Sequence, residues 1–304
     1  MISTKKMNND LINKIINYSK KYENNNQNNT VNLLNNKIIG LYFLEPSTRT
    51  MLSFQAAVYR LGGNVIIYSN ENSSEKKGES FEDTIKAIEC YCDILILRHP
   101  EKNKVKEVSD RLNIPVINAG DGDKEHPTQA LLDLYTMDSY FKIYTEKNLN
   151  KKILIIGDIK SRTINSLLYL LFKYTSCIIN YVIINENCEN LKEKWLEEFP
   201  MFHNNYFYKL SNIEELNNLK NIDYDIVYMT RFQKEKYDKK ENNNNCIINK
   251  NFMDRLNKNS IIMHPLPRNN EIDKSLDEDK RMVYFDQMKK GVYVRMAILA
   301  NINF

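Results

Sequence analysis

Short apolar runs alternate with amphipathic segments along the first half of the chain. Runs of strand length are followed by segments whose apolar residues recur at helical spacing. The predicted strands are 37–43, 64–68, 94–97 and 115–118, and the predicted helices are 10–22, 47–61, 80–91, 101–112 and 126–135. A strand that regularly alternates with a helix is typical of βαβ units, and therefore of a parallel sheet.

The same alternation restarts after a polar, basic segment at 142–151, which is the best candidate for a domain boundary. Further strands are predicted at 153–156, 178–184, 206–209, 225–229 and 260–263, with helices from Ser161 and over 291–302. We therefore predict an α/β protein with two doubly wound parallel-sheet domains. The first would cover 1–141, completed by a C-terminal helix at 290–304, and the second 151–289.

Length and composition agree with this organisation. A chain of 304 residues can hold two domains with separate cores, and a hydrophobic fraction of 42% is typical of a globular protein. The formal net charge is only +4, and the lysines are spread among asparagine-rich stretches instead of forming one basic stripe. Nucleic acid is therefore not expected as a partner.

The cysteines and the apolar runs bear on the compartment. The five cysteines are an odd number without C-x-x-C spacing, so neither a disulfide framework nor a zinc site is indicated. No run approaches the ~18 consecutive apolar residues of a membrane helix, and the polar N-terminus does not resemble a signal peptide. We expect a cytoplasmic protein without a membrane partner. A location in an organelle is the alternative if a leader was removed.

One strand-to-helix turn has the features of an anion site. The strand at 37–43 stops shortly before a helix that opens on Ser47, Thr48, Arg49 and Thr50. The first N–H groups of a helix have no partner within it and carry partial positive charge. Together with hydroxyl groups and an arginine, they suit a phosphate. By itself, the motif also fits a serine cap beside a solvated arginine.

Other polar residues follow strands of the same predicted sheet. Arg98 ends the strand at 94–97, and His126 and Gln129 lie on one face at the start of a helix. Since ligands gather at the carboxyl ends of parallel strands, Arg98 should share an edge with the anion site. For His126, a packing role and a functional role are equally open.

The second half carries three further polar clusters at strand ends. They are Ser161-Arg162-Thr163, Thr230-Arg231-Phe232-Gln233 and His264-Pro265-Leu266-Pro267-Arg268. The prolines of the last cluster remove backbone donors and leave carbonyl oxygens free to accept hydrogen bonds. A nucleotide-binding dehydrogenase is disfavoured, because G-x-G-x-x-G is absent.

These motifs, in this order, resemble the carbamoyltransferases, and most closely the catalytic chains of the aspartate-specific members. The resemblance runs from about residue 38 to the C-terminus. It implies transfer of the carbamoyl group of carbamoyl phosphate to the α-amine of L-aspartate, which gives N-carbamoyl-L-aspartate and phosphate in an early step of de novo pyrimidine biosynthesis. No cofactor, metal or covalent enzyme intermediate is expected.

The resemblance also implies roles for individual residues. Carbamoyl phosphate would contact Ser47, Thr48, Arg49, Thr50, Ser73, Lys77, Arg98, His126, Gln129, Pro265 and Leu266. Aspartate would contact Lys77, Arg162, Arg231, Gln233 and Leu266. The residues expected to act in catalysis are Arg49, Thr50, Lys77, Arg98 and His126.

Two consequences concern the assembly of the site. Ser73 and Lys77 match loop residues that, in the family, reach into the active site of a neighbouring subunit, which implies a homotrimer with shared sites. The carbamoyl-phosphate motifs mostly precede residue 140 and the aspartate motifs mostly follow residue 150, so a cleft between the domains is the expected site.

The acceptor is argued from specific positions. Ornithine carbamoyltransferases typically carry a cysteine in His-Cys-Leu-Pro and lack an Arg-x-Gln cluster, whereas this chain has Pro265, Arg231 and Gln233. A dicarboxylate acceptor is therefore favoured. The alternatives are another acceptor, such as ornithine or an acylated derivative, and a non-catalytic relative that serves as a scaffold.

Overall fold

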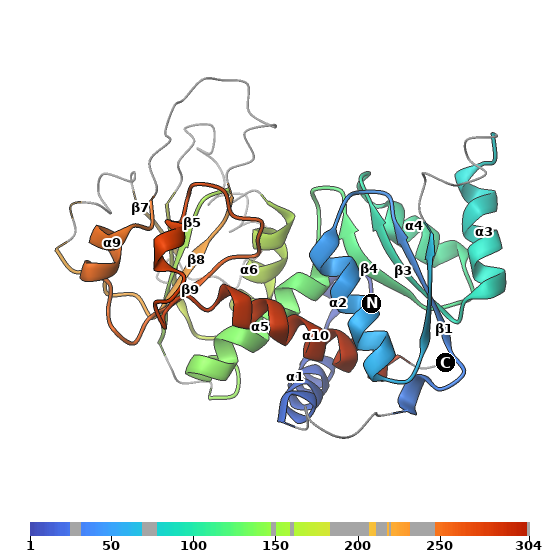
Figure 1. Ribbon diagram of the computed structural model, residues 1–304, viewed down its shortest axis with the longest axis horizontal. Helices are drawn as coiled ribbons and strands as arrows, with labels where there is room; N and C mark the ends of the chain where they lie inside the picture. Colours follow the sequence, from blue (N-terminus) through green and yellow to red (C-terminus); the bar gives the residue numbers. More distant parts are fainter. Residues whose placement is uncertain are drawn as a thin grey trace. The chain divides into compact units, whose positions relative to one another are not determined.

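The fold consists of two compact units, each built on a parallel sheet (Figure 1). The computed structural model describes residues 1–24, 32–68, 78–146, 150–158, 161–182, 207–210, 218, 220–231 and 247–302. Unit 1 comprises Met1–Thr136, Ser161–Leu170 and Met288–Phe304, and unit 2 comprises Met137–Lys160 and Leu171–Gln287.

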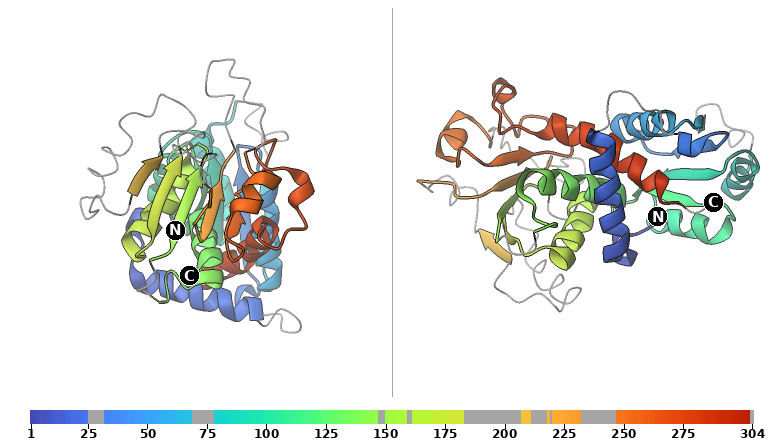
Figure 2. Two further views of the ribbon diagram at one scale, coloured as in Figure 1. Left: turned by 90° about the vertical axis from the view of Figure 1, so that its left-hand side faces the viewer. Right: turned by 90° about the horizontal axis from the view of Figure 1, so that it is seen from below.

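Within the described residues, unit 1 contains a four-stranded parallel sheet in the order β2-β1-β3-β4. The strands are β1 (Ile38–Phe43), β2 (Asn64–Tyr68), β3 (Ile94–His99) and β4 (Val116–Asp121). The connecting helices are α2 (Thr48–Arg60), α3 (Phe81–Tyr91) and α4 (Lys104–Arg111). Right-handed crossovers place α2 on one face and α3 and α4 on the other (Figures 1 and 2). This confirms the predicted doubly wound arrangement.

Apolar spacing explains how these helices cover the sheet. A single cluster joins the buried faces of α3 and α4 to β1, β3 and β4, and it contains Tyr42, Ile85, Ile88, Cys92, Leu95, Leu97, Val105, Val108, Leu112 and Val116. Helix α1 (Asn9–Asn24) likewise buries Ile12 together with Ile15 and Ile16, which follow it three and four positions later. The predicted helix at 10–22 is thereby confirmed.

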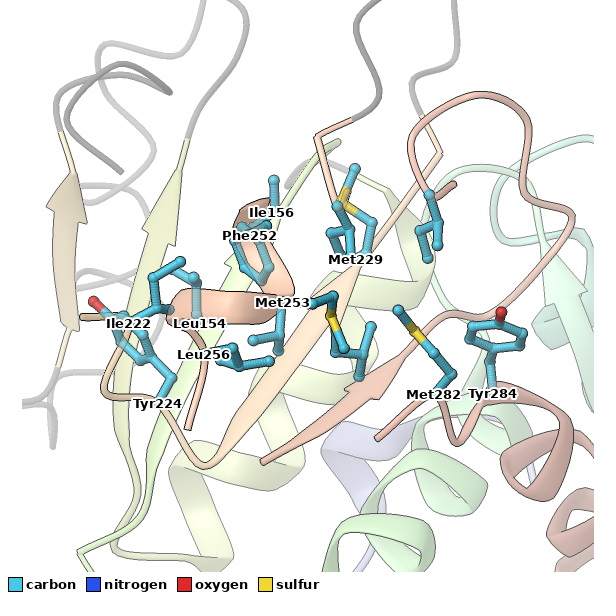
Figure 3. Close-up of a cluster of buried hydrophobic side chains, with 14 residues drawn as sticks. Leu154, Ile156, Ile222, Tyr224, Met229, Phe252, Met253, Leu256, Met282 and Tyr284 are labelled. Carbon is cyan, nitrogen blue, oxygen red and sulfur yellow. The ribbon is translucent and has the colours of Figure 1, made fainter. Parts of the chain in front are cut away.

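Unit 2 contains, among the described residues, a five-stranded parallel sheet in the order β7-β6-β5-β8-β9. The strands are β5 (Lys152–Ile156), β6 (Ile178–Val182), β7 (Phe207–Leu210), β8 (Ile226–Met229) and β9 (Ile261–Met263). Helix α9 (Lys250–Arg255) packs Phe252 and Met253 against this sheet, in a core that also includes Leu154 and Met229 (Figure 3). The predicted second parallel sheet is confirmed.

Three further α-helices and three 3-10 turns complete the described elements. They are α5 (Pro127–Phe141), α6 (Arg162–Tyr174), α10 (Tyr284–Ala300), and the 3-10 turns η1 (Thr4–Lys6), η2 (Asn32–Leu34) and η6 (Lys274–Leu276). No helix in the described part of the chain is both long and apolar enough to cross a membrane.

Several predicted boundaries were wrong. The last helix begins at Tyr284, not at Gly291, because Gly291 lies inside it: a Cβ there would come within 3.2 Å of Leu132 Cδ2. Strand β4 continues to Asp121, past the predicted end at residue 118. Helix α4 starts only at Lys104, since Asn103 has a left-handed φ of 67°. Residues 183 and 184 of one predicted strand lie outside the described residues.

Candidate active site

The predicted anion site lies at the carboxyl end of β1. Helix α2 starts at Thr48, with Ser47 as its N-cap residue (φ −158°, ψ 78°). Thr50 is buried, Ser47 and Arg49 are partly buried, and Thr48 is exposed. In the described part of the chain, the Ser47 hydroxyl accepts no capping bond from the first turn. The turn therefore presents backbone N–H groups, hydroxyl groups and a guanidinium together.

Arg98 lies at the same edge of the sheet. Strands β1 and β3 are parallel neighbours, with Phe43 opposite Arg98 in the register. The pairing continues one residue further, because the Leu44 N–H donates to the Arg98 carbonyl at 3.0 Å. The prediction that Arg98 shares an edge with Ser47–Thr50 is confirmed.

Glu45 connects two of the candidate residues. It is not among the site residues predicted from the sequence. Its Oε2 accepts from Arg98 Nε at 3.0 Å and from Arg162 Nη2 at 2.8 Å, and Arg162 also donates to the Gly122 carbonyl. The side chains of Arg98 and Arg162 are only 12% and 16% exposed. The signal in the sequence was a carboxylate directly before an arginine-bearing turn.

The arginines keep this edge of unit 1 electropositive. Burial is the main cause that lowers the pKa of Arg98 to about 10. The positive charge of Arg162 and, more weakly, that of Arg49 lower this pKa as well, and Glu45 opposes them by raising it. The guanidinium groups of Arg162 and Arg49 are thus both close enough to act on Arg98, and the Glu45 carboxylate lies between Arg98 and Arg162. An anionic ligand would relieve this repulsion.

His126 is buried beside the same arginines. Its backbone N–H donates to Ser166 Oγ at 2.9 Å, and its Nδ1 is buried without a hydrogen-bond partner among the described residues. Burial, then the charges of Arg98, Arg162 and Arg295, lowers its pKa well below the ordinary 6.5. The ring is therefore a neutral imidazole at neutral pH, with one N–H to donate.

Gln129 lies one turn further along α5. Its Nε2 donates to Asp133 Oδ1 at 2.9 Å, which orients the amide. The oxygen of the same side-chain amide, Gln129 Oε1, can then accept a hydrogen bond from an amide ligand. Asp133, which orients it, was not identified from the sequence.

Three candidate residues belong to unit 2. Arg231 follows β8 and is partly buried, and Pro265 and Leu266 follow β9 and are also partly buried. Leu266 has a left-handed φ of 55°, and its N–H donates to His264 Nδ1 at 2.8 Å. The other predicted site residues, Ser73, Lys77 and Gln233, lie outside the described residues. No cluster of three or more His, Cys, Asp or Glu side chains suited to a metal occurs in the part of the chain described.

Comparisons with known proteins agree with both halves of this description. Residues 1–139 match the family described as aspartate/ornithine carbamoyltransferase, carbamoyl-P binding domain. Residues 149–302 match the Asp/Orn binding domain of the same family. The aspartate carbamoyltransferase catalytic subunit of Clostridium acetobutylicum is 41% identical over 278 residues, which covers 88% of this chain and 85% of the relative.

Solved structures give the same result. Aspartate transcarbamoylase from Trypanosoma cruzi, in complex with carbamoyl aspartate and phosphate, superposes with a TM-score of 0.86 at 32% identity and covers 100% of this chain and 95% of its own. The catalytic subunit of M. jannaschii aspartate transcarbamoylase gives a TM-score of 0.85 at 37% identity and covers 99% of this chain and 96% of its own. With matches that span both units, the chain belongs to the aspartate/ornithine carbamoyltransferase family.

Proposed function

We propose that the chain transfers the carbamoyl group of carbamoyl phosphate to the α-amine of L-aspartate, giving N-carbamoyl-L-aspartate and phosphate. One observation carries the proposal: at the carboxyl edge of the unit 1 sheet, Arg98 and Arg162 both donate to Glu45 Oε2, and their charges reach the buried ring of His126. The relatives named above act in this reaction or hold its product, which supports the same conclusion.

The phosphate would be bound by Ser47, Thr48, Arg49 and Thr50 at the start of α2. Attack of the amine on the carbamoyl carbon gives a tetrahedral intermediate, and its collapse expels phosphate. Holding both substrates in the reacting orientation can supply ~7–11 kcal/mol of the barrier. Neither step requires a covalent bond to the enzyme.

Charge on the former carbonyl oxygen would be stabilised by Thr50, Arg98 and His126. Donors that are already in place when this charge develops are an effective means of lowering the barrier. The depressed pKa of His126 suits a neutral donor better than a general base. The departing phosphate can itself take up the proton of the amine.

The carbamoyl amide would be held by the oxygen atoms of Gln129, Pro265 and Leu266. Aspartate would be bound by Arg162, Arg231, Gln233, Lys77 and the Leu266 backbone. Two anionic substrates repel each other, so several cations are needed where one would suffice for binding alone. We further propose that carbamoyl phosphate binds first. Full-affinity aspartate binding to the empty protein in equilibrium dialysis would contradict this order.

The assembly is proposed to be a cytoplasmic homotrimer. Ser73 and Lys77 of one subunit would contribute to the active site of its neighbour. The family resemblance of the segment that carries them supports this arrangement.

The reaction is tested by offering carbamoyl phosphate with L-aspartate or with L-ornithine to the purified protein. Arg49→Ala and Arg231→Ala are assayed in parallel, and Arg60→Ala, an exposed arginine at the other end of α2, is the matched control. We expect carbamoyl aspartate from the wild type and the control only. Citrulline would overturn the acceptor assignment of Arg231 and Gln233, and no product from either acceptor would favour a scaffold role.

A further inference from the structure

A buried histidine–carboxylate pair lies directly behind the turn that follows β9. The side chains of His264 and Glu271 are 0% and 4% exposed, and His264 Nε2 lies 2.9 Å from Glu271 Oε1. On the other side of the ring, His264 Nδ1 lies 2.8 Å from the backbone nitrogen of Leu266. The ring therefore connects a buried carboxylate to the backbone of the turn.

The contacts determine where the ring proton lies. A backbone N–H can only donate, so Nδ1 must be an acceptor without a proton, and the proton of the ring is on Nε2, facing Glu271. Burial alone would raise the pKa of Glu271, but the hydrogen bonds from His264 and from the Asn269 N–H outweigh it and the pKa is lowered. An ionised Glu271 is an acceptor only, and it keeps the ring in this tautomer.

The backbone conformation of Leu266 requires stabilising contacts. Its φ of 55° lies in the left-handed region, which a side chain with a Cβ rarely adopts. Two contacts hold it there: the bond to His264, and the packing of its side chain against the apolar core of unit 2. The conformation of the turn thus depends on the acceptor that His264 provides.

The geometry of the peptide unit links this bond to the candidate site. The Pro265–Leu266 bond is trans, because the cis peptide bond of the described residues is the next one, Leu266–Pro267. In a trans peptide the C=O and the N–H point in opposite directions. Since the Leu266 N–H points at the buried His264 ring, the Pro265 carbonyl points away from it.

We propose that His264 and Glu271 are positioning residues that fix the direction of the Pro265 carbonyl, and so determine selection for a carbamoyl amide over a group that cannot donate a hydrogen bond. The inference rests on the proposed function, in which this carbonyl accepts from the carbamoyl NH2. His264 and Glu271 would then affect which ligand is selected, in addition to the stability of unit 2.

Acetyl phosphate separates these two effects, because it replaces the NH2 of carbamoyl phosphate with a methyl group of similar size. Dissociation constants of both ligands are measured by titration calorimetry for the wild type and variants, with folding checked by thermal unfolding. In His264→Leu the preference for carbamoyl phosphate should fall about three- to tenfold, the worth of one neutral hydrogen bond, while acetyl phosphate binding is unchanged.

Two further variants sharpen the test. In His264→Asn the side-chain oxygen can accept from the N–H two residues ahead, as in an Asx turn, and should restore the preference. In Glu271→Gln the amide cannot accept on both sides, and the preference should fall. The matched control, Ile272→Val, trims a buried neighbour without touching these bonds and should leave the preference unchanged.

The outcomes distinguish this inference from the proposed function. A wild type that does not bind carbamoyl phosphate overturns both. A wild type that makes carbamoyl aspartate, with His264→Leu weakening both ligands equally, overturns the inference alone. If His264→Leu does not fold, Glu271→Gln decides in the same way.

Discussion

Glu45 places a single negative charge between two partly buried arginines. Arg98 and Arg162 both donate to its Oε2, at 3.0 and 2.8 Å, with little exposure to solvent. Without this carboxylate the two guanidinium groups would repel each other at short range. The residue therefore fixes where both side chains lie before any ligand arrives.

Replacing Glu45 should reduce activity without unfolding the protein. In Glu45→Gln the charge is lost and only one arginine can keep a good acceptor, so kcat/KM for carbamoyl transfer should fall about tenfold to a hundredfold, as for loss of a charge-assisted hydrogen bond of about 1.5–3 kcal/mol. Steady-state kinetics measure the change. Glu82→Gln is the control: Glu82 pairs with Arg111 at an exposed surface, where ion pairs contribute little.

The buried state of His126 should appear in the pH dependence of stability. Its pKa is near 6.5 in the unfolded chain and far lower in the folded one, so below pH 6.5 the unfolded state binds the extra proton. The free energy of unfolding should therefore fall as the pH drops, by up to about 1.4 kcal/mol per pH unit from this group. His126→Gln should lose this component in urea unfolding series between pH 5 and 8. If the free energy of unfolding changed with pH by the same slope in the wild type and in His126→Gln, His126 would be protonated in the folded protein as well, against this prediction.

At the scale of elements, the ends of neighbouring strands come too close for a side chain at one position. Gly157 follows β5 with a φ of +120°, and a Cβ there would lie 2.2 Å from Thr230 Oγ1 and 2.5 Å from the Thr230 carbonyl oxygen. Thr230 follows β8 and donates its N–H to the Ile156 carbonyl at 2.8 Å. The glycine thus allows β5 and β8 to stay paired up to their last residues.

Gly157→Ala should destabilise unit 2 through two effects. The left-handed φ costs about 1–2 kcal/mol for a residue with a Cβ, and displacing the backbone of Thr230 adds about 1–3 kcal/mol. Gly78→Ala is the matched control, because Gly78 also has a positive φ (+94°) but an added Cβ would meet no atom of the described residues within 4 Å. Calorimetry should show a clearly larger fall in Tm for Gly157→Ala. Equal falls would mean that the close approach to Thr230 is relieved at no cost.

At the scale of the whole molecule, the division into units does not follow the order of the chain. Unit 1 takes Ser161–Leu170 and Met288–Phe304 in addition to the first 136 residues. Arg162 therefore contacts Glu45 and Gly122 although more than a hundred residues separate it from Glu45. All three residues belong to unit 1, so these contacts depend on how distant segments of the chain meet within that unit.

The proposed trimer makes a quantitative prediction. Light scattering should give a mass of about 108 kDa, three times 36.0 kDa. Arg49→Ala and Lys77→Ala should each be inactive, but trimers reassembled from a 1:1 mixture should regain about a quarter of wild-type activity, because some sites then combine two intact contributions. No recovery would show that Arg49 and Lys77 act from the same subunit.

Most of the architecture could be predicted from local patterns. Strands β1, β2, β3 and β5 and the helices between them follow apolar periodicity, since burial on one or both faces imposes a period that the chain itself displays. The shared edge of Arg98 and Ser47 follows from the same logic, because parallel strands end together. Boundaries were less predictable. Gly291 resembles a helix start, yet it lies inside a helix, where an added Cβ would come within 2.7 Å of Arg295 Nη1 and 3.2 Å of Leu132 Cδ2.

The two parallel sheets, the order of the motifs and the arginine-bearing turn could be predicted, because each depends on residues close together in the chain. The contacts between distant side chains could not be predicted in this way. Three arrangements depend on which side chains meet across elements and on how much water they lose: Glu45 between Arg98 and Arg162, His126 Nδ1 without a partner among the described residues, and Glu271 behind His264. Those two quantities set charge and proton position, and no local pattern contains them.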